Sequence, residues 1–485
     1  MRSSVESGNG ENEGDGRHRN ARAIGLPSSA GGGYRAGIIV WCCFTTLACA
    51  TEVNLTRAGV SGAAPAGVNL VGHVTGSMGL GVAARNTLSV LAAGGRDFEA
   101  IDVDPGGGRQ GADRTSAHLV ADRPAAPYSV NLFHMNPPEV ASLVASAPPW
   151  LEVVGRANVA VPFWELPRLP VAPPWRELLG AMDLVLAPSR FILGAVEGSC
   201  PGVRVVHYPQ TVFLPEGVTP NRARFGLPED AVLFHVGLDV TSDLTRKNPA
   251  AVLAAFRAAF DPDAAVKLVV KLRHLRSGHP WADPEPLLAE LAATPNTIVI
   301  DQDLSYAEAL SLAASCDVCV SLHRAEGLSL HLLEAMALGK PVVATARSGN
   351  MDFMSEDDAC LVGFELVPVQ AAHPCYRSAA IGPGQTWAEP RVAEAAAWMR
   401  KLADDSGMRQ RIGGAALAAV KASRSAALAG GALAAIDAVA TTGPRGVKER
   451  ADRRARWRRF GPPSLPVRVW RSARRLATRL VGEGR

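Results

Sequence analysis

From Gly67 onward, short apolar stretches alternate with longer segments whose apolar residues recur at helical spacing. Buried strands are predicted for GVNLVGHV, YSVNLFHM, MDLVLAPS and RVVHYP, and a helix ending at Gly94 is predicted for GLGVAARNTLSVLAAGG. After a polar, proline-containing stretch, LPEGVTPNRARFGLPED, the alternation resumes with AVLFHVG, AVKLVVKL, NTIVID, CDVCVSL and KPVVATA. Two such alternations predict two parallel sheets, each covered by helices on both faces.

The chain is therefore expected to be an α/β protein with two Rossmann-like domains, residues 67–215 and 222–405, facing each other across a cleft. Ligands of such sheets bind beyond the carboxyl ends of the strands, so the cleft is the expected site. A further helix, GQTWAEPRVAEAAAWMRKLADD, is predicted near the end of the second domain. Residues 1–66, rich in Gly, Ser, Asn and Ala, are expected to be disordered or to result from a wrongly assigned start codon.

Cysteine usage and the N-terminal segment bear on localisation. The eight cysteines follow no regular spacing, which predicts a reducing compartment. Residues 36–50, AGIIVWCCFTTLACA, are short for a membrane span. They resemble the core of a signal peptide, but 35 residues precede them, which is long for a signal. We assign them no function, do not expect secretion, and expect a cytoplasmic protein.

The pair CDVC, Cys316 and Cys319, invites comparison with a zinc site. The surrounding SCDVCVSL is apolar and β-branched, so it predicts a strand, on which residues three apart point to opposite faces. No second pair of this kind follows. Both thiols are therefore expected to be buried in the core.

Composition and charge separate the body of the chain from its end. Of the 485 residues, 47% are hydrophobic and 20% charged, which is typical of globular proteins. The last 42 residues hold 14 Lys and Arg against 3 Asp and Glu, a net charge of +11, whereas the whole chain carries +4. Residues 443–485 thus form a basic tail attached to a mildly acidic body.

Within this tail, VRVWRSARRLATRLV predicts an amphipathic helix. Val469, Trp470, Leu476 and Leu480 share one arc, and arginines fill the opposite one. Such a helix favours an anionic membrane surface, here the inner face of the plasma membrane, although nucleic-acid contact and a partner helix are alternatives. We expect no nucleic-acid partner.

The most unusual stretch is HRAEGLSLHLLEAMALGKPVVAT, residues 323–345. It predicts a loop, a helix over residues 328–338 that is apolar on every face and so buried all round, and a strand. Glu334 lies in that helix, and Glu326 just precedes it. A buried carboxylate needs a partner, so either internal arginines pair with these residues or both bind the hydroxyls of a ligand. A diol such as that of a ribose matches a carboxylate, and the helix N-terminus suits a phosphate.

EGLSLHLLEAMALGKPVVAT resembles the E-x7-E signature of retaining glycosyltransferases with the GT-B fold, of the family-4 (group 1) type. SLHRAEG, SGNMDFM and WAEP resemble a subgroup of bacterial polysaccharide enzymes. The resemblance covers most of residues 67–405. It implies that Glu326 approaches the donor sugar, that Glu334 holds the ribose of the nucleotide, and that the backbone of Gly327 and Leu328 meets the diphosphate.

Cations suited to a diphosphate occur in VGLDVTSDLTRKNP. Lys247 matches the lysine of the family's GR…KG pattern, but Leu238 stands where the family has arginine, and Arg246 is the candidate substitute. Lys271, at the end of KLVVKL, is a weaker candidate. Two further residues, Ser348 and Asn350 in SGNMDFM, are assigned to donor binding through the resemblance.

In the first domain, GHVTGSMGLGVAAR predicts a glycine-rich turn, in which Gly76, Gly79 and Gly81 allow a phosphate to approach the backbone. The absence of GK[ST] excludes a P-loop. His134, in NLFHMNPP, is expected at a strand end, and the resemblance implies contact with the transferred sugar, with Asn136 a weaker candidate. The carboxylates of IDVD are taken as ordinary strand-end residues rather than a metal-binding DxD.

Together these features predict a retaining glycosyltransferase that moves a hexose from a nucleotide-sugar donor to a saccharide or lipid-linked acceptor in cell-surface polysaccharide synthesis. The catalytic candidates are Glu326, Lys247 and His134, with no cofactor and no metal. Three alternatives stay open: a nucleotide-sugar epimerase of the same fold, a non-catalytic binding scaffold, and a nucleic-acid-binding protein that would rest on the tail alone.

Overall fold

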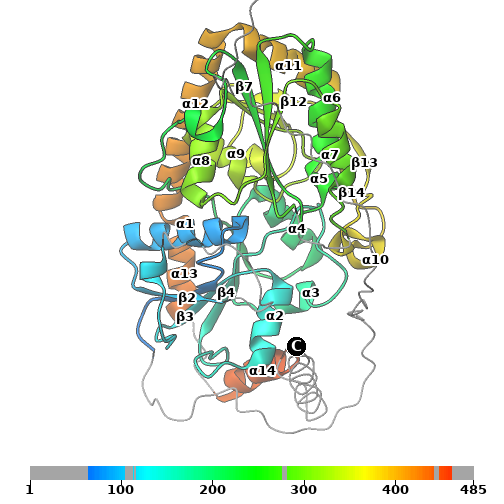
Figure 1. Cartoon of the computed structure of the whole chain (residues 1–485). Coiled ribbons are helices and arrows are strands. Elements are labelled where there is room, and N and C mark those ends of the chain that lie inside the picture. Colours follow the sequence, from blue (N-terminus) through cyan, green and yellow to red (C-terminus); the bar gives the residue numbers. More distant parts are fainter. Residues whose placement is uncertain (1–63, 104–112, 114–115, 276–280, 442–446, 461–485) are drawn as a thin grey trace, which may run out of the picture. The chain divides into compact units, whose positions relative to one another are not determined.

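The computed structural model describes residues 64–103, 113, 116–275, 281–441 and 447–460, and Figure 1 shows their helices and strands. Two six-stranded parallel sheets organise these residues. The first sheet has the order β2-β1-β3-β4-β5-β6, with strands at Val68–Gly72 (β1), Phe98–Asp102 (β2), Val130–His134 (β3), Ala157–Ala160 (β4), Leu184–Ala187 (β5) and Val205–His207 (β6). Its order changes direction between β1 and β3, which makes the loops after these two strands a topological switch point.

Three buried asparagines tie the middle of the first sheet together. Asn69, Asn131 and Asn158 lie opposite one another on β1, β3 and β4. The Asn69 amide donates to Asn131 and the Asn131 amide to Asn158, each over 3.0 Å. Because a slip by one residue would leave these buried amides unpaired, the asparagine ladder sets the register of the strands.

Helices cover both faces of the first sheet, at Gly79–Ala93 (α1), Pro137–Ser146 (α2), Trp175–Leu179 (α3) and Arg190–Ser199 (α4). Helix α1 ends before Gly94 as predicted. Helix α4 begins after Ser189, whose hydroxyl accepts a hydrogen bond from the backbone N–H of Ile192.

The second sheet has the order β12-β11-β10-β7-β8-β9, with strands at Val232–Asp239 (β7), Val266–Arg273 (β8), Thr297–Ile300 (β9), Val318–Ser321 (β10), Val342–Thr345 (β11) and Cys360–Val362 (β12). This is the strand order of a Rossmann fold, with the switch point between β7 and β10. The predicted linker before it contains one short 3₁₀ turn, Ala223–Phe225.

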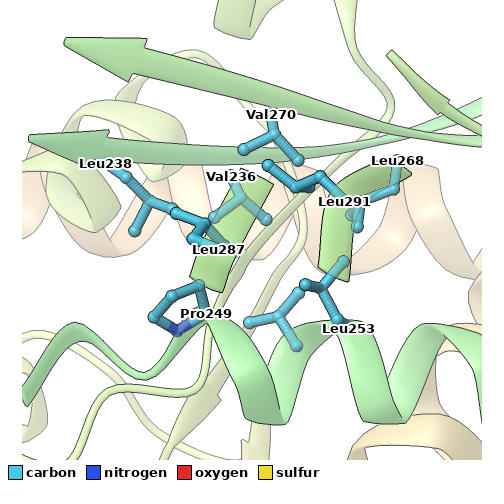
Figure 2. A pocket seen from close by; sticks show the side chains of 9 residues that line it. Val236, Leu238, Pro249, Leu253, Leu268, Val270, Leu287 and Leu291 are labelled. Carbon is cyan, nitrogen blue, oxygen red and sulfur yellow. The ribbon is translucent and has the colours of Figure 1, made fainter. Parts of the chain in front are cut away.

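The helices of the second unit form a layer on each side of β7, with α6 and α7 on one side and α8 and α9 on the other (Figure 1). Their bounds are Leu244–Lys247 (α5), Pro249–Ala259 (α6), Glu285–Ala292 (α7), Tyr306–Ser315 (α8), Leu330–Ala337 (α9) and Val392–Asp404 (α11). Figure 2 shows the apolar side chains of β7, β8, α6 and α7 that fill the first of these layers. Burying this surface is the main stabilising contribution to the unit.

Between β12 and α11 the chain makes an excursion, residues 364–390, which we call the arm. It consists of an antiparallel pair of strands, Phe364–Pro368 (β13) and Thr386–Pro390 (β14), joined through a 3₁₀ turn at Pro374–Tyr376 (η4) and a short helix at Ser378–Ile381 (α10). Tyr376, Ile381 and Trp387 of the arm are buried in the same hydrophobic cluster as Phe133 and Trp164 of the first unit. The arm therefore packs against the first unit.

After α11 the chain returns to the first unit through Ser406–Leu428 (α12), Gly431–Thr441 (α13) and Val447–Arg458 (α14). Leu433 and Ile436 of α13 join the core around Leu70. In α14, Arg453 forms an ion pair with Asp183 at 2.7 Å, and Trp457 is 1% exposed within the first unit's core. The described beginning of the predicted basic tail is thus a docked helix, whereas the predicted amphipathic segment from Val467 onward lies outside the described residues.

The structure confirms some predictions from the sequence and corrects others. Cys316 and Cys319 are buried in different hydrophobic clusters, as expected for core thiols. The helix predicted over residues 328–338 is α9, which begins at Leu330 because Ser329 has left-handed backbone angles, φ 68° and ψ 53°. It is not buried all round, since His331 and Glu334 are partly exposed. The helix predicted from Gly384 was wrong at its start, because residues 386–390 form β14 and α11 begins only at Val392.

In the described part of the chain, no helix is both long and apolar enough to cross a membrane.

The docking of α14 can be tested through Trp457. Replacing this buried indole by alanine is expected to destabilise the fold by about 3 kcal/mol, because the cavity left behind cannot close fully. Thermal and urea unfolding of Trp457→Ala would measure the loss, with Arg458→Ala, an exposed residue of the same helix, as the control. Equal stability of the two variants would contradict the docking.

Candidate functional site

The switch point of the second sheet gathers the sequence candidates. Strands β7 and β10 are neighbours in the sheet, although 78 residues lie between the last residue of β7, Asp239, and the first residue of β10, Val318. The segment after β7 contains α5, which ends with Arg246 and Lys247, and the loop after β10 carries Glu326. Because both segments leave the carboxyl edge of adjacent strands, the three side chains meet there.

Glu326 lies between two cations. Its Oε1 is 2.6 Å from Nζ of Lys247 and 3.0 Å from Nη1 of Arg246, and the residue is 7% exposed. Burial alone would raise the pKa of Glu326, but Lys247 and Arg246 outweigh it and hold the pKa well below its ordinary range. The carboxylate is therefore ionised at neutral pH.

The two cations differ in what else they contact. Arg246 is 5% exposed, donates from Nη1 to the carbonyl of Ala325 at 2.8 Å, and stacks over the ring of Tyr376 at 5.8 Å. The side chain of Lys247 is 17% exposed. Lys247 is thus the cation of this pair that solvent reaches more readily.

The loop that carries Glu326 is held at close backbone contacts. Gly349 donates its N–H to the Glu326 carbonyl at 3.0 Å, and a Cβ on Gly349 would lie 1.9 Å from the carbonyl oxygen of Gly327. A Cβ on Gly327 would lie 2.8 Å from the carbonyl of Trp164, and the Ser189 hydroxyl donates to the carbonyl of Gly327 at 2.7 Å. Only glycine fits at Gly327 and Gly349, so the loop before Leu328 is packed tightly in place.

Glu334 occupies a different setting, in the middle of α9. Its Oε1 accepts a hydrogen bond of 2.8 Å from the hydroxyl of Tyr306, the first residue of α8. Burial raises the pKa of Glu334 to about 7, although the Tyr306 hydrogen bond and the charge of Arg85 act in the opposite direction. The guanidinium of Arg85, from α1, lies 5.5 Å from the centre of the Tyr306 ring.

Lys271, Ser348 and Asn350 also lie around the carboxyl edge of the second sheet. Lys271 on β8 donates from Nζ to the carbonyl of Leu272, and burial lowers its pKa. Ser348 has a positive φ of 82° and is buried. Asn350 is fully buried, donates to the carbonyl of Thr345 at 3.0 Å, and has its Oδ1 3.2 Å from Nε2 of His323. These contacts fix Asn350 to the end of β11 and to the loop after β10.

The candidates of the first unit follow β1 and β3. Gly79 is the first residue of α1, and a Cβ there would meet no atom within 4 Å, whereas one on Gly81 would lie 2.0 Å from the carbonyl of Gly76. His134 ends β3 as predicted and is fully buried. Burial lowers the pKa of His134 to about 3, so its ring is neutral, and neither ring nitrogen has a hydrogen-bond partner among the described residues. Asn136 accepts from the N–H of Phe163 at 2.8 Å, which is a structural contact.

Sequence reasoning missed four residues at these edges. Tyr306 orients Glu334, and Arg273 at the end of β8 donates to the carbonyl of Ser77 in the glycine-rich turn at 2.6 Å. Burial lowers the pKa of His331 on α9 to about 3 and that of His235 on β7 to about 4. The only sequence signal for either histidine is that it interrupts an apolar run.

Comparisons with known proteins address the fold of the chain and the family of its second half. Residues 248–372 match the family model described as glycosyl transferases group 1. Sucrose-phosphate synthase from Thermosynechococcus elongatus is 16% identical with a TM-score of 0.52, over 75% of this chain and 96% of that one. The α,α-trehalose 6-phosphate synthase from Burkholderia multivorans is 13% identical with a TM-score of 0.50, over 78% and 98% of the two chains.

The Anabaena protein HepE, in complex with UDP and glucose, is 14% identical with a TM-score of 0.49, over 73% of this chain and 94% of that one. The search of curated proteins finds no match. The two parallel-sheet units thus form a GT-B fold, as predicted. The residues that match the group 1 model belong to the second unit, and the loop of Glu326 lies among them.

The environment of Glu334 predicts how stability depends on pH. An unfolded chain releases this proton near its ordinary value of 4.5, whereas the folded protein releases it near pH 7. Between these values the folded state binds more protons, so the free energy of unfolding falls as the pH rises. For this one group the fall is on the order of 1–3 kcal/mol.

Urea unfolding from pH 5 to pH 8 tests this effect by comparing wild type with Glu334→Gln, which keeps an acceptor for Tyr306 but cannot titrate. The stability of the variant relative to wild type should rise over this interval. The exposed Glu356→Gln serves as the control and should follow wild type. If the difference in free energy of unfolding between Glu334→Gln and wild type stayed constant from pH 5 to pH 8, the raised pKa of Glu334 would be contradicted.

Proposed function

We propose that this chain is a retaining glycosyltransferase of the family-4 type that moves a hexose from a nucleotide sugar to a saccharide or lipid-linked acceptor in cell-surface polysaccharide synthesis. The observation that carries the proposal is the ion cluster of Glu326 with Lys247 and Arg246, at the switch point of the unit that matches group 1 glycosyl transferases. The polysaccharide role rests on the resemblance of SLHRAEG, SGNMDFM and WAEP alone.

Donor binding is proposed to centre on Glu334 and Lys247. The two oxygens of Glu334 suit the adjacent hydroxyls of a ribose, and Tyr306 already holds one oxygen in place. Because a diol donates to the ionised form, nucleotide binding would lower the pKa of Glu334 from about 7. Lys247, which solvent reaches, faces the diphosphate together with the backbone of Gly327 and Leu328 ahead of α9.

In the proposed reaction the acceptor hydroxyl oxygen bonds to the anomeric carbon as the bond from that carbon to the diphosphate oxygen breaks. The acceptor proton passes to the departing diphosphate oxygen on the same face of the sugar, so configuration is retained without a protein nucleophile. Negative charge grows on the diphosphate during this step, and Lys247 is placed to stabilise it. Glu326 supplies a fixed negative charge beside the donor sugar, where positive charge develops at the anomeric carbon.

A donor screen followed by product analysis tests the proposal. Thermal shift and isothermal titration with UDP-, GDP- and dTDP-sugars should identify one nucleotide class that binds. Incubation of that donor with acceptors in EDTA should then yield a glycoside whose anomeric configuration, read by NMR, equals that of the donor.

Each other outcome points to a different protein. An inverted product, or activity lost in EDTA and restored by a divalent ion, would contradict the mechanism. Isomerised donor in the absence of acceptor would indicate an epimerase, and binding without turnover would indicate a scaffold. Glu334→Ala should weaken donor affinity by about tenfold or more while the chain still folds, as expected for loss of a charged hydrogen bond, whereas Glu356→Ala should bind like wild type.

We also propose that residues 443–485 hold the enzyme at an anionic membrane surface on the cytoplasmic side, where a lipid-linked acceptor would be available. In support, Arg454, Arg458 and Arg459 are exposed on or beside α14, whereas Arg453 and Trp457 pack inward. Each basic residue near such a surface contributes about 1 kcal/mol to attraction.

Co-sedimentation with vesicles tests this location. Wild type should bind phosphatidylglycerol vesicles at low salt but not phosphatidylcholine vesicles. A variant with glutamate at positions 468, 471, 475 and 479 should lose this binding while keeping turnover with a soluble acceptor. Equal binding by both proteins would contradict the role of the tail.

A further inference from the structure

Arg246 is held by several contacts within the second unit. Its backbone N–H donates to the carboxylate of Asp243, the residue that caps α5, at 2.9 Å. Its carbonyl accepts from the N–H of Arg324 at 2.8 Å, and its Nη1 reaches both the Ala325 carbonyl and Glu326. Backbone and side chain together therefore tie α5 to the loop of Glu326.

The arm adds a further contact to this guanidinium. Tyr376 of η4 stacks on Arg246, and its hydroxyl donates to the carboxylate of Glu165 at 2.8 Å. Glu165 belongs to the first unit and follows Trp164, whose ring is 5.5 Å from that of Tyr376. A series of direct contacts thus runs from Glu165 through Tyr376 and Arg246 to Glu326.

The arm is anchored near both ends of this series. Asp243 accepts from the N–H of His373 at 2.9 Å, which fixes the turn before Tyr376 to the cap of α5. Further along, the carbonyl of Ala380 accepts from the N–H groups of Val171 and Ala172 in the first unit. Tyr376 is consequently held between the two units rather than at the surface.

These contacts separate the roles of two adjacent cations. Arg246 is 5% exposed and engaged on one side by Glu326 and on the other by Tyr376, so a diphosphate could reach it only if the arm moved. Lys247 shares Glu326 but keeps an exposed fraction of 17%. A planar guanidinium suits simultaneous contact with a carboxylate, a carbonyl and a ring, whereas an ammonium group suits a mobile point contact.

We propose that Arg246 is a positioning residue for Glu326 and not a ligand of the donor diphosphate, and that Tyr376 and Glu165 hold it in that position. This role rests on the proposed transferase function, because it assumes that Glu326 acts on the donor sugar. It gives a residue of the first unit, Glu165, indirect control over the position of the Glu326 carboxylate.

The test compares Arg246→Lys, Arg246→Gln and Lys247→Gln in the full chain. Titration with UDP and GDP measures nucleotide affinity, which reports on the contact with the diphosphate. Steady-state kinetics with the donor identified by the screen measures kcat, which reports on the position of Glu326. Both Arg246 variants should bind the nucleotide within about threefold of wild type, while kcat falls by about 30-fold or more because Glu326 is misplaced. Lys247→Gln should weaken nucleotide binding by about tenfold or more, as expected for loss of a charged contact.

The pH dependence of kcat gives a readout that a merely structural role would not change. The charged and titratable groups near Glu326 are Lys247, Arg246, His323 and His331. Replacing Arg246 by glutamine removes one of the cations that lower the pKa of Glu326, so the acid limb of the profile should move to higher pH. In Arg246→Lys, which keeps the charge, the limb should move less.

Tyr376→Phe keeps the ring over Arg246 but removes the hydrogen bond to Glu165, and it should lower kcat by about three- to tenfold without changing nucleotide affinity. The matched control is Tyr208→Phe, which removes the hydrogen bond from another buried tyrosine to Thr87 and should leave kcat unchanged. Thermal unfolding of each variant identifies loss of fold, and Arg246→Lys and Tyr376→Phe are mild enough to keep the test informative if Arg246→Gln does not fold.

Nucleotide affinity in both Arg246 variants that falls as far as in Lys247→Gln would overturn the proposal, because Arg246 would then be a diphosphate ligand. Wild-type kcat and an unmoved acid limb in Arg246→Gln would overturn it as well. A wild-type chain that neither binds nucleotides nor transfers sugar would refute the transferase function itself, which is a separate result.

Discussion

The carboxylate of Glu326 is ionised in a place that solvent hardly reaches, and the architecture around it follows from that constraint. An isolated buried carboxylate would cost several kcal/mol, so it requires partners that stay in position. Lys247 and Arg246 provide them at 2.6 Å and 3.0 Å. Keeping two cations beside one carboxylate requires α5 and the loop after β10 to be rigid, which explains the caps and glycine contacts around them.

The topology of the second sheet brings the two cations and Glu326 together. Contacts with the arm then give the two cations different exposure to solvent. Because β7 and β10 meet at a switch point, a cationic segment and an acidic loop share one edge. Tyr376 covers one cation, and the other stays within reach of solvent. The pKa of Glu334 changes in the opposite direction, because burial raises it to about 7. The hydroxyl of Tyr306 donates a hydrogen bond to this carboxyl group and orients it. Two carboxylates eight residues apart therefore lie in very different electrostatic environments.

Much of this organisation could be predicted from local patterns. Alternating apolar runs were enough for both parallel sheets, and the motifs around Glu326 and Lys247 identified both residues as candidates. Their direct contact was found only in the structure. The position of the arm could not be predicted, because the burial of Tyr376 depends on residues about 200 positions away, such as Glu165. Nothing in the sequence around Tyr306 indicates that its hydroxyl contacts Glu334 of the next helix. The left-handed conformation of Ser329, which delays α9 by two residues, also has no local signal.

A crystal structure of the full chain with a bound nucleoside diphosphate sugar tests the account most directly. It should place the ribose hydroxyls on Glu334 and the diphosphate on Lys247 and the backbone ahead of α9, with Arg246 still paired to Glu326 beneath Tyr376. A nucleotide bound away from the carboxyl edge of β7 and β10, or Glu326 and Glu334 both turned away from it in internal ion pairs, would contradict the account.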